Sequence, residues 1–284
     1  MIKLQFAVKS HEKVDRYRKR VRTLKPIRPS RIAEASYRDK LLHIVSKLNN
    51  VAKEELLPFL LNQPDIVQDG VMDSSTGDEI RRRIKELARR VNISESDSTI
   101  IASNIIKKIK TNVDERLASE IRKSVSIDIS PALRNDTRLD SLVQQAVKEN
   151  VALIKTIPQQ YFEKLEKYVI EAFEKGDRHE KLALSIKKVA QITESRAKII
   201  ARDQTSKING SFNRIRQTSI GIDTYTWSTS QDERVRDSHV ANEGKKFKWD
   251  DPPEETGHPG EDIMCRCVAI PFFDLDQMEK DLGI

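Results

Sequence analysis

The sequence predicts a mainly α-helical protein, with an elongated helical N-terminal and middle region and a small α+β domain at the C-terminus. Aromatic residues make up only 5% of the 284 residues and glycine occurs nine times, which is too few for the strands and turns of an all-β fold. Apolar residues recur every three or four positions through most of residues 32–215, as on the buried face of a helix. After Gly221 the pattern changes to short β-prone runs separated by Asp, Gly and Pro.

Residues 1–31 form a basic N-terminal arm. They hold eleven Lys and Arg residues against Glu12 and Asp15, a balance of +9 in a chain of net charge +7, so the rest of the chain is slightly acidic. Such a dense positive run favours a polyanion, either DNA or an acidic protein surface. The alternative is a solvated or protein-docking segment. The residues expected to make the contacts are Lys13, Arg16, Arg18, Lys19, Arg20, Arg22 and Lys25.

The first predicted helix covers residues 32–57, and Pro58 and Pro64 are expected to end it. A polar linker over residues 64–77 follows. Thr76-Gly-Asp-Glu79 has the form of a capping box and predicts the start of the next helix.

After a turn at Asn92–Ser94, a long helix carries apolar residues at strict four-residue steps from Ile101 to Val125. Each such step advances the apolar face by roughly 40°, so the face spirals around the helix. We expect this face to pack on several neighbours, to dock on partner helices or to associate with a second copy. Ser130-Pro131 breaks the pattern.

Helices resume at Asp140 and continue past Pro158 to a turn at Gly176-Asp177. A short helix to Ala190, a turn at Thr193–Arg196 and a long helix to about Ile215 are then predicted. The segments 93–102 and 192–201 resemble each other, and each follows a short helix. A capped corner between two helices explains this better than a DNA-reading helix-turn-helix, because no base-reading set of residues is evident.

The side chains with metal-binding chemistry gather near the C-terminus, between the β-prone runs 225–229 and 268–273. Two histidines and two thiolates suit a tetrahedral zinc ion, and a site with four protein ligands is structural because it leaves no position for a substrate. The alternative is that both cysteines are small buried residues and that His239 only packs. The predicted zinc ligands are His239, His258, Cys265 and Cys267.

Sequence signals for an enzyme are weak, since the chain has no Gly-rich phosphate loop, nucleophile elbow or H-E-x-x-H motif. The alternative to a structural protein is a metal-dependent nuclease or transferase centred on Asp232, Glu233 and His239. The chain also lacks a run of about 18 apolar residues and an apolar leader, so we expect a soluble protein made inside the cell, with no membrane partner.

The order of residues from 150 onward resembles the phage head morphogenesis family, the minor head proteins typified by the F protein of phage Mu. The resemblance covers about residues 145–275 and is carried by an ordered series of motifs. These are Asn150-Val-Ala-Leu-Ile-Lys155, Arg196-Ala-Lys-Ile-Ile-Ala-Arg-Asp-Gln-Thr205, Asp232-Glu-Arg-Val-Arg-Asp-Ser-His239 (with Arg234 and Arg236 at its centre), Gly244, Pro252-Pro253, His258-Pro259 and Cys265-Arg-Cys267. Four residues lengthen the loop between Pro259 and Met264 relative to many members.

The resemblance implies a non-enzymatic minor capsid protein, located in the capsid interior of the virion and in the host cytoplasm during assembly. It implies the portal protein as partner, with scaffold, major capsid protein and DNA as further candidates. The predicted organisation is a basic arm (1–31), a helical region of unassigned type (32–140) and a Mu F-like domain (141–284) whose loop-rich end piece begins at about residue 222.

Overall fold

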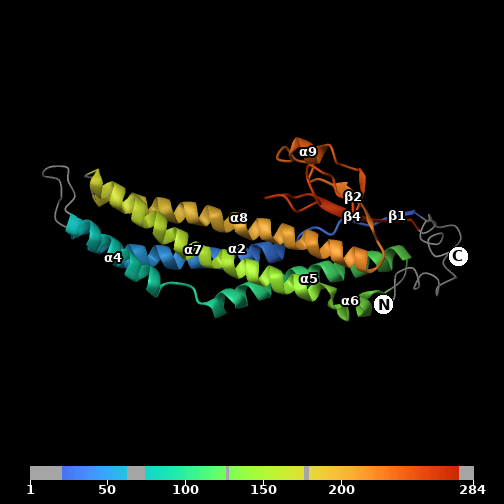
Figure 1. Cartoon of the computed structure of the whole chain (residues 1–284), viewed down its shortest axis with the longest axis horizontal. Coiled ribbons are helices and arrows are strands. Elements are labelled where there is room, and N and C mark those ends of the chain that lie inside the picture. Colours follow the sequence, from blue (N-terminus) through green and yellow to red (C-terminus); the bar gives the residue numbers. More distant parts are fainter. Residues whose placement is uncertain (1–20, 63–73, 126–127, 176–178, 275–284) are drawn as a thin grey trace. The chain divides into compact units, whose positions relative to one another are not determined.

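The computed structural model describes residues 21–62, 74–125, 128–175 and 179–274. They form long helices and one small antiparallel sheet near the C-terminus, which confirms the predicted fold class (Figure 1). No helix in these ranges is long and apolar enough to cross a membrane. In chain order the elements are β1 (Val21–Thr23), α2 (Arg31–Val51), a π-helical turn (Ala52–Leu56), α3 (Leu57–Leu61), α4 (Ser74–Arg90), α5 (Glu95–Val125), α6 (Ser130–Arg134), a 3₁₀ turn (Thr137–Leu139), α7 (Asp140–Glu174), α8 (His179–Ser219), β2 (Thr224–Ser228), α9 (Asp237–Val240), β3 (Lys246–Lys248) and β4 (Val268–Asp274).

The chain divides into two compact units that alternate along the sequence. The first, which we call the sheet unit, takes its residues from 1–34, 104–146 and 202–284. The second, the helical unit, consists of residues 35–103 and 147–201. The long helices α5 and α8 contribute residues to both, so the units are not consecutive segments of the chain.

In the helical unit, side-chain hydrogen bonds join α7 to α2 and to α8. The Tyr37 hydroxyl of α2 donates to Asn150 Oδ1 at 2.9 Å, and both residues are buried. Arg196 of α8 donates to the Thr156 hydroxyl at 3.2 Å, and the buried side chains of these helices are mainly apolar. The unit is therefore held mainly by burial of the periodic apolar residues that predicted the helices.

Pro58 does not end the helix as predicted, whereas the helix continues past Pro158 as expected. The first helical region continues through Pro58, which lies in the first turn of α3, and ends at Leu61. In the first turn of a helix a proline costs no hydrogen bond, because the N–H that it lacks would have no partner within that helix. The π-helical turn just before Pro58 also changes the register of the backbone hydrogen bonds. Pro158 lies inside α7 and is buried, so packing offsets the lost backbone hydrogen bond.

The two similar segments differ in structure. Ser94 caps α5, since its Oγ accepts from Asp97 N at 3.0 Å, as the predicted turn requires. The predicted turn at Thr193 is wrong, because α8 is unbroken from His179 to Ser219. The Thr193 hydroxyl bonds within the helix to Val189 O at 2.8 Å instead of capping a new one. The capping box at Thr76 is also displaced, because α4 begins at Ser74.

The sheet unit contains a four-stranded antiparallel sheet of order β1-β4-β2-β3. Strands β2 and β4 lie where the sequence predicts them, whereas β3 and β1 were not predicted. Strand β1 comes from the basic arm and places Arg22 opposite Phe273. Lys25 follows this strand, and its backbone N–H donates to Glu120 at 3.3 Å. The predicted contact residues Lys13, Arg16, Arg18, Lys19 and Arg20 lie outside the described residues.

The spiralling face of α5 is buried over most of its length, so this part is not a free docking surface. Its residues from 105 to 121 are almost fully buried, namely Ile105, Ile109, Val113, Leu117 and Ile121. Beside them the fully buried Arg216 of α8 donates to both carboxylate oxygens of Asp114, at 2.7 and 3.0 Å, and to Asp136 at 3.0 Å. These pairs satisfy a charge that would otherwise be costly to bury.

Candidate metal centre

The structure brings His239, Cys265 and Cys267 together in the sheet unit. Their ligand atoms all lie within 4.8 Å of one another, and each residue is at most 3% exposed. His239 lies on the short helix α9, and the cysteines lie on the segment that enters β4. Three of the four predicted zinc ligands therefore form one cluster that could hold a metal ion.

The interatomic distances within this cluster fit a single small ion. His239 Nδ1 lies 3.3 Å from Cys267 Sγ and 3.6 Å from Cys265 Sγ. On a tetrahedral zinc with ordinary bond lengths, a nitrogen and a sulfur ligand are roughly 3.6 Å apart. The two nitrogen–sulfur distances are thus close to those expected in a bound state.

Asp262 fixes the orientation of the His239 ring. Its Oδ2 lies 2.8 Å from His239 Nε2, on the opposite side of the ring from the two sulfurs. A carboxylate at this position favours the tautomer with the proton on Nε2, which leaves the Nδ1 lone pair directed at the sulfur pair. This carboxylate–histidine arrangement is typical of metal-bound histidines.

The surroundings also favour a thiolate at Cys265. A hydrogen bond from the Cys267 thiol is the main reason that the pKa of Cys265 falls to about 6, and it correspondingly raises the pKa of Cys267. The Cys267 backbone N–H also points at Cys265 Sγ, 3.4 Å away. Because metals bind the thiolate form, one of the two sulfurs is already in the required state near neutral pH.

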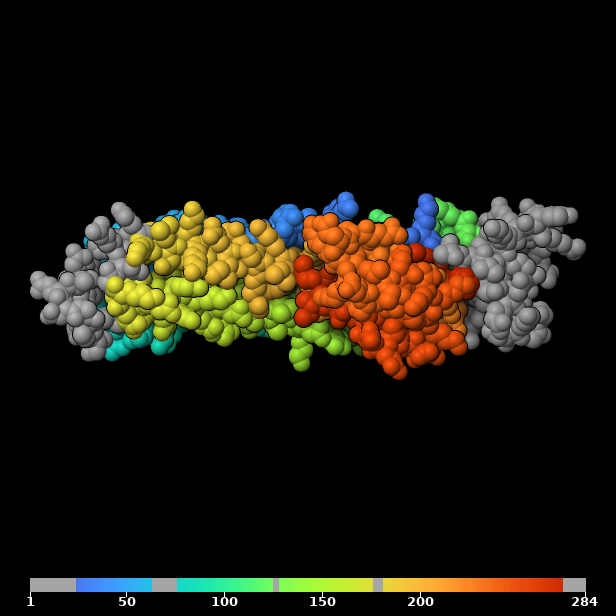
Figure 2. Space-filling model, turned by 90° about the horizontal axis from the view of Figure 1, so that it is seen from above, coloured from blue at the N-terminus to red at the C-terminus, as the bar shows by residue number. Residues whose placement is uncertain are grey.

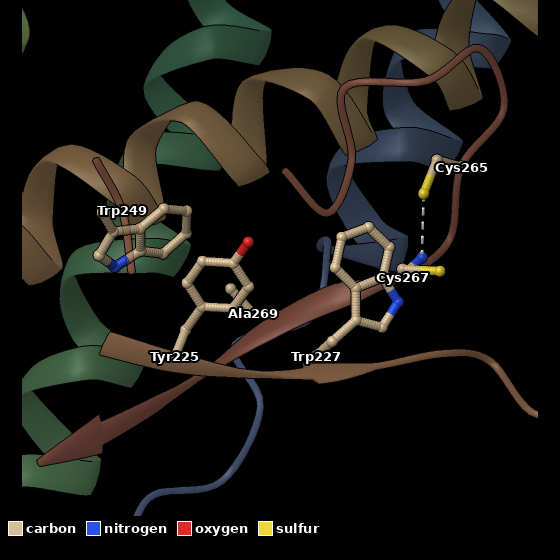
Figure 3. Packing of buried hydrophobic residues seen from close by; sticks show 6 residues of the cluster. All are labelled: Tyr225, Trp227, Trp249, Cys265, Cys267 and Ala269. Carbon is tan, nitrogen blue, oxygen red and sulfur yellow. Dashed lines mark hydrogen bonds between the residues drawn. The ribbon is translucent and has the colours of Figure 1, made fainter. Parts of the chain in front are cut away.

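An aromatic cluster surrounds the cysteines, consisting of Tyr225, Trp227, Trp249, Cys265, Cys267 and Ala269 (Figure 3). The Trp227 side chain lies beside Cys267 and meets the His239 ring edge-on, with the ring centroids 5.4 Å apart. Residues 222–274, orange to red in Figure 2, gather into one compact body around this cluster.

Helix α8 anchors the loop that carries the cysteines. Asp203 Oδ1 accepts from Met264 N at 2.7 Å, and Met264 has a positive φ of 59° that this bond helps to hold. The Ser206 hydroxyl donates to Cys265 O at 2.6 Å. At Gly210 a Cβ atom would lie only 2.8 Å from Pro259 O, so glycine permits the loop to approach the helix.

No role in the site was predicted for Asp203, Ser206 or Gly210. Their positions are i, i+3 and i+7, which places them on one face of α8. The signal in the sequence was a row of polar and small residues at helical spacing. Such a row does not by itself identify the segment that packs on it.

His258 does not join the other three predicted ligands. Its Nδ1 lies 3.0 Å from the Tyr225 hydroxyl, and its ring packs against Tyr225 and Trp249 with centroids 5.6 and 5.0 Å away. Burial lowers its pKa, which favours the neutral ring. In this structure His258 is a core residue of the loop, and Glu261 Oε2 accepts from its backbone N–H at 2.7 Å.

The predicted motif residues around the site are engaged in local contacts. Asp232 pairs through both carboxylate oxygens with Arg266, which lowers the Asp232 pKa, and it also accepts from Arg234 N at 3.1 Å. Arg236 donates to Ile263 O at 2.7 Å. Gly244 has a φ of 73° and donates to Trp227 O at 2.9 Å, so it forms the turn between α9 and β3.

Comparisons with known proteins agree with the resemblance drawn from the motifs. Residues 163–270 match the family model described as phage Mu protein F like protein, which confirms a Mu F-like region. A protein of Haemophilus influenzae, described only as uncharacterized, is 34% identical over 259 residues. That match covers 90% of this chain and 56% of the relative, so the chain spans little more than half of the relative's length. No solved structure matches.

Proposed function

We propose that this chain is a minor head protein that acts in head morphogenesis of a tailed phage and is not an enzyme. The observation that carries the proposal is the Mu F-like match over residues 163–270, which contains all four predicted zinc ligands and the α8 residues that anchor the cysteine loop. The proposed partner is the portal protein inside the forming capsid, with scaffold, major capsid protein and packaged DNA as further contacts. The chain would then reside in the capsid interior of the virion.

Within this function, the role of the metal centre is structural. A zinc ion held by His239 Nδ1 and the two sulfurs would connect α9 to the start of β4, in a region whose strands are short. Asp262→Ala removes the partner of His239 Nε2 and should weaken zinc binding about 10- to 100-fold without unfolding the protein. Unchanged zinc affinity in this variant would exclude the proposed orientation of the ring.

A metal-dependent nuclease or transferase is the second candidate, because three protein ligands leave one position on a tetrahedral ion open, as in catalytic zinc sites. Its proposed base is weakly supported, since Asp232 is paired with Arg266 and has a lowered pKa. His239→Ala separates the two functions. The structural role predicts a lower unfolding temperature of the sheet unit, whereas loss of a turnover activity in an equally stable protein would favour the enzyme.

The head assignment is tested directly on particles. Mass spectrometry of purified heads should detect this chain together with the portal protein, and heads assembled without it should be defective in formation or in DNA content. Detection of the chain only outside the particles would refute the assignment.

The basic arm is proposed to bind DNA without sequence preference. Deleting residues 1–20 keeps β1 and removes seven Lys and Arg residues, so it tests the charge without removing a strand of the sheet. We expect the deletion to abolish most of the salt-sensitive binding of unrelated duplexes, measured between 50 and 200 mM salt. Equal binding by both forms would reject this role.

A further inference from the structure

A cavity of about 240 Å³ adjoins the metal centre and is lined by four arginines. His239, Cys265 and Cys267 form part of its wall, together with Ser230, Val235 and Met264. The guanidinium-bearing residues are Arg202 from α8, Arg234 and Arg236 from the segment before α9, and Arg266 between the two cysteines. Segments that are distant in the sequence thus place guanidinium groups around one small cavity.

The charges around this cavity are not balanced. Three carboxylates lie next to it and are already engaged: Asp232 with Arg266, Asp262 with Arg236 and His239, and Asp203 with Lys207 and the Met264 backbone N–H. Within the described residues, the side chains of Arg202 and Arg234 make no hydrogen bond or ion pair, and no Asp or Glu lines the cavity. A bound zinc ion would not change this excess of positive charge, since the two thiolates neutralise the charge of the ion.

The donors remaining in the cavity suit an oxyanion. Arg202 is half-buried and Arg234 is exposed, and each offers a planar fork of N–H donors that matches two oxygens of a phosphate. The Ser230 hydroxyl also lines the cavity, and its Oγ is buried without a partner among the described residues. The volume lies below that of ordinary small-molecule pockets, so it suits a single phosphate group better than a whole nucleotide.

We propose that this cavity is a phosphate-binding site, in which Arg202 and Arg234 hold the anion and Ser230 donates to one of its oxygens. The phosphate is either free in solution or part of a nucleic-acid backbone, because both present the same group. The site is separate from the basic arm and does not depend on the portal-binding role proposed above.

The test measures binding of inorganic phosphate to the zinc-loaded full chain by ³¹P NMR titration at constant ionic strength. The double variant Arg202→Gln with Arg234→Gln should bind phosphate at least about tenfold more weakly than the wild type. The matched control, Arg89→Gln with Arg134→Gln, removes the same charge from two exposed arginines outside the cavity and should bind as the wild type does. Circular dichroism checks that both variants fold.

A competing DNA duplex distinguishes the two sources of phosphate. Displacement of inorganic phosphate by the duplex from the wild type assigns the site to a nucleic-acid backbone, and no displacement assigns it to free phosphate or a small phosphate ester. Equal loss of phosphate binding in the cavity variant and the control variant, or no loss in either, would overturn the proposal.

Discussion

The two compact units use different means to hold their helices and strands together. In the helical unit the most deeply buried side chains are mainly apolar, such as Leu41, Ile154 and Leu165, and most ion pairs lie at the surface. In the sheet unit more polar side chains are buried, and they include charged or titratable groups, among them Arg216, His239 and His258. The helical unit therefore depends on burial of apolar area, whereas the sheet unit depends on specific polar contacts and, as we propose, on a metal ion.

Removing the sulfurs of both cysteines should have the largest effect, and it should act on the sheet unit. In Cys265→Ser with Cys267→Ser, zinc content measured by elemental analysis should fall from about one ion per chain to none. Because structural zinc contributes on the order of 10 kcal/mol to folding in zinc-finger peptides, we expect the sheet around Trp227 to lose its fixed structure. Near-ultraviolet circular dichroism and tryptophan fluorescence would report this. Full retention of both signals in the zinc-free variant would show that the sheet unit needs no metal.

A substitution that creates a cavity in the helical unit should lower the stability of the protein without changing its zinc content. Leu165→Ala removes a fully buried side chain of α7 and should lower the free energy of unfolding by about 2–5 kcal/mol. Zinc content should not change, because Leu165 belongs to the helical unit and the ligands do not. Denaturant unfolding followed at 222 nm measures the first effect. Loss of zinc in this variant would contradict independent stabilisation of the two units.

The same difference explains which features the sequence could predict. Periodic apolar residues predicted the helices, because burying one stripe produces a regular pattern. The predicted ends of the helices were less accurate, since Pro58 and Thr193 have local preferences that tertiary packing overrides. Strand β1 was missed because its three residues pair with a strand about 250 positions further along the chain.

The candidate site was predicted in part for a related reason. The chemistry of His239, Cys265 and Cys267 is visible in the sequence, because few residue types bind zinc. The orientation of His258 depends on packing against Tyr225 and Trp249, which no spacing rule describes. The roles of Asp203 and Gly210 follow from how the loop lies on α8, which is a contact between segments some 50 to 60 residues apart.

Gly210 offers a smaller perturbation that acts on the sheet unit through geometry alone. In Gly210→Ala the new Cβ would lie 2.8 Å from Pro259 O, a backbone atom that cannot rotate away. We expect a loss of about 1–3 kcal/mol despite the higher helix propensity of alanine, and weaker zinc binding because the cysteine loop shifts. Thermal unfolding and a competitive zinc titration measure the two effects.

The control for Gly210→Ala is Gly244→Ala. A Cβ at Gly244 would meet nothing within 4 Å, so only its φ of +73° is unfavourable, at a cost of about 1 kcal/mol, with no change in zinc affinity. If Gly210→Ala leaves both stability and zinc affinity unchanged, the loop does not depend on its close approach to α8.

The smallest expected effect is a pH dependence specific to His258. Burial lowers its pKa below the ordinary value of 6.5, so the folded state holds the neutral ring and the unfolded state binds the additional proton. Stability from this group is therefore present above pH 6.5 and is lost as the pH falls below that value, with a slope of at most about 1.4 kcal/mol per pH unit for one proton.

His258→Gln can still accept from the Tyr225 hydroxyl but does not titrate, so its unfolding free energy should depend less on pH between 5 and 7. Zinc release at acid pH affects both proteins, and the difference between their slopes isolates the histidine. Identical slopes would mean that His258 is readily protonated in the folded state and that the core around Tyr225 tolerates its charge.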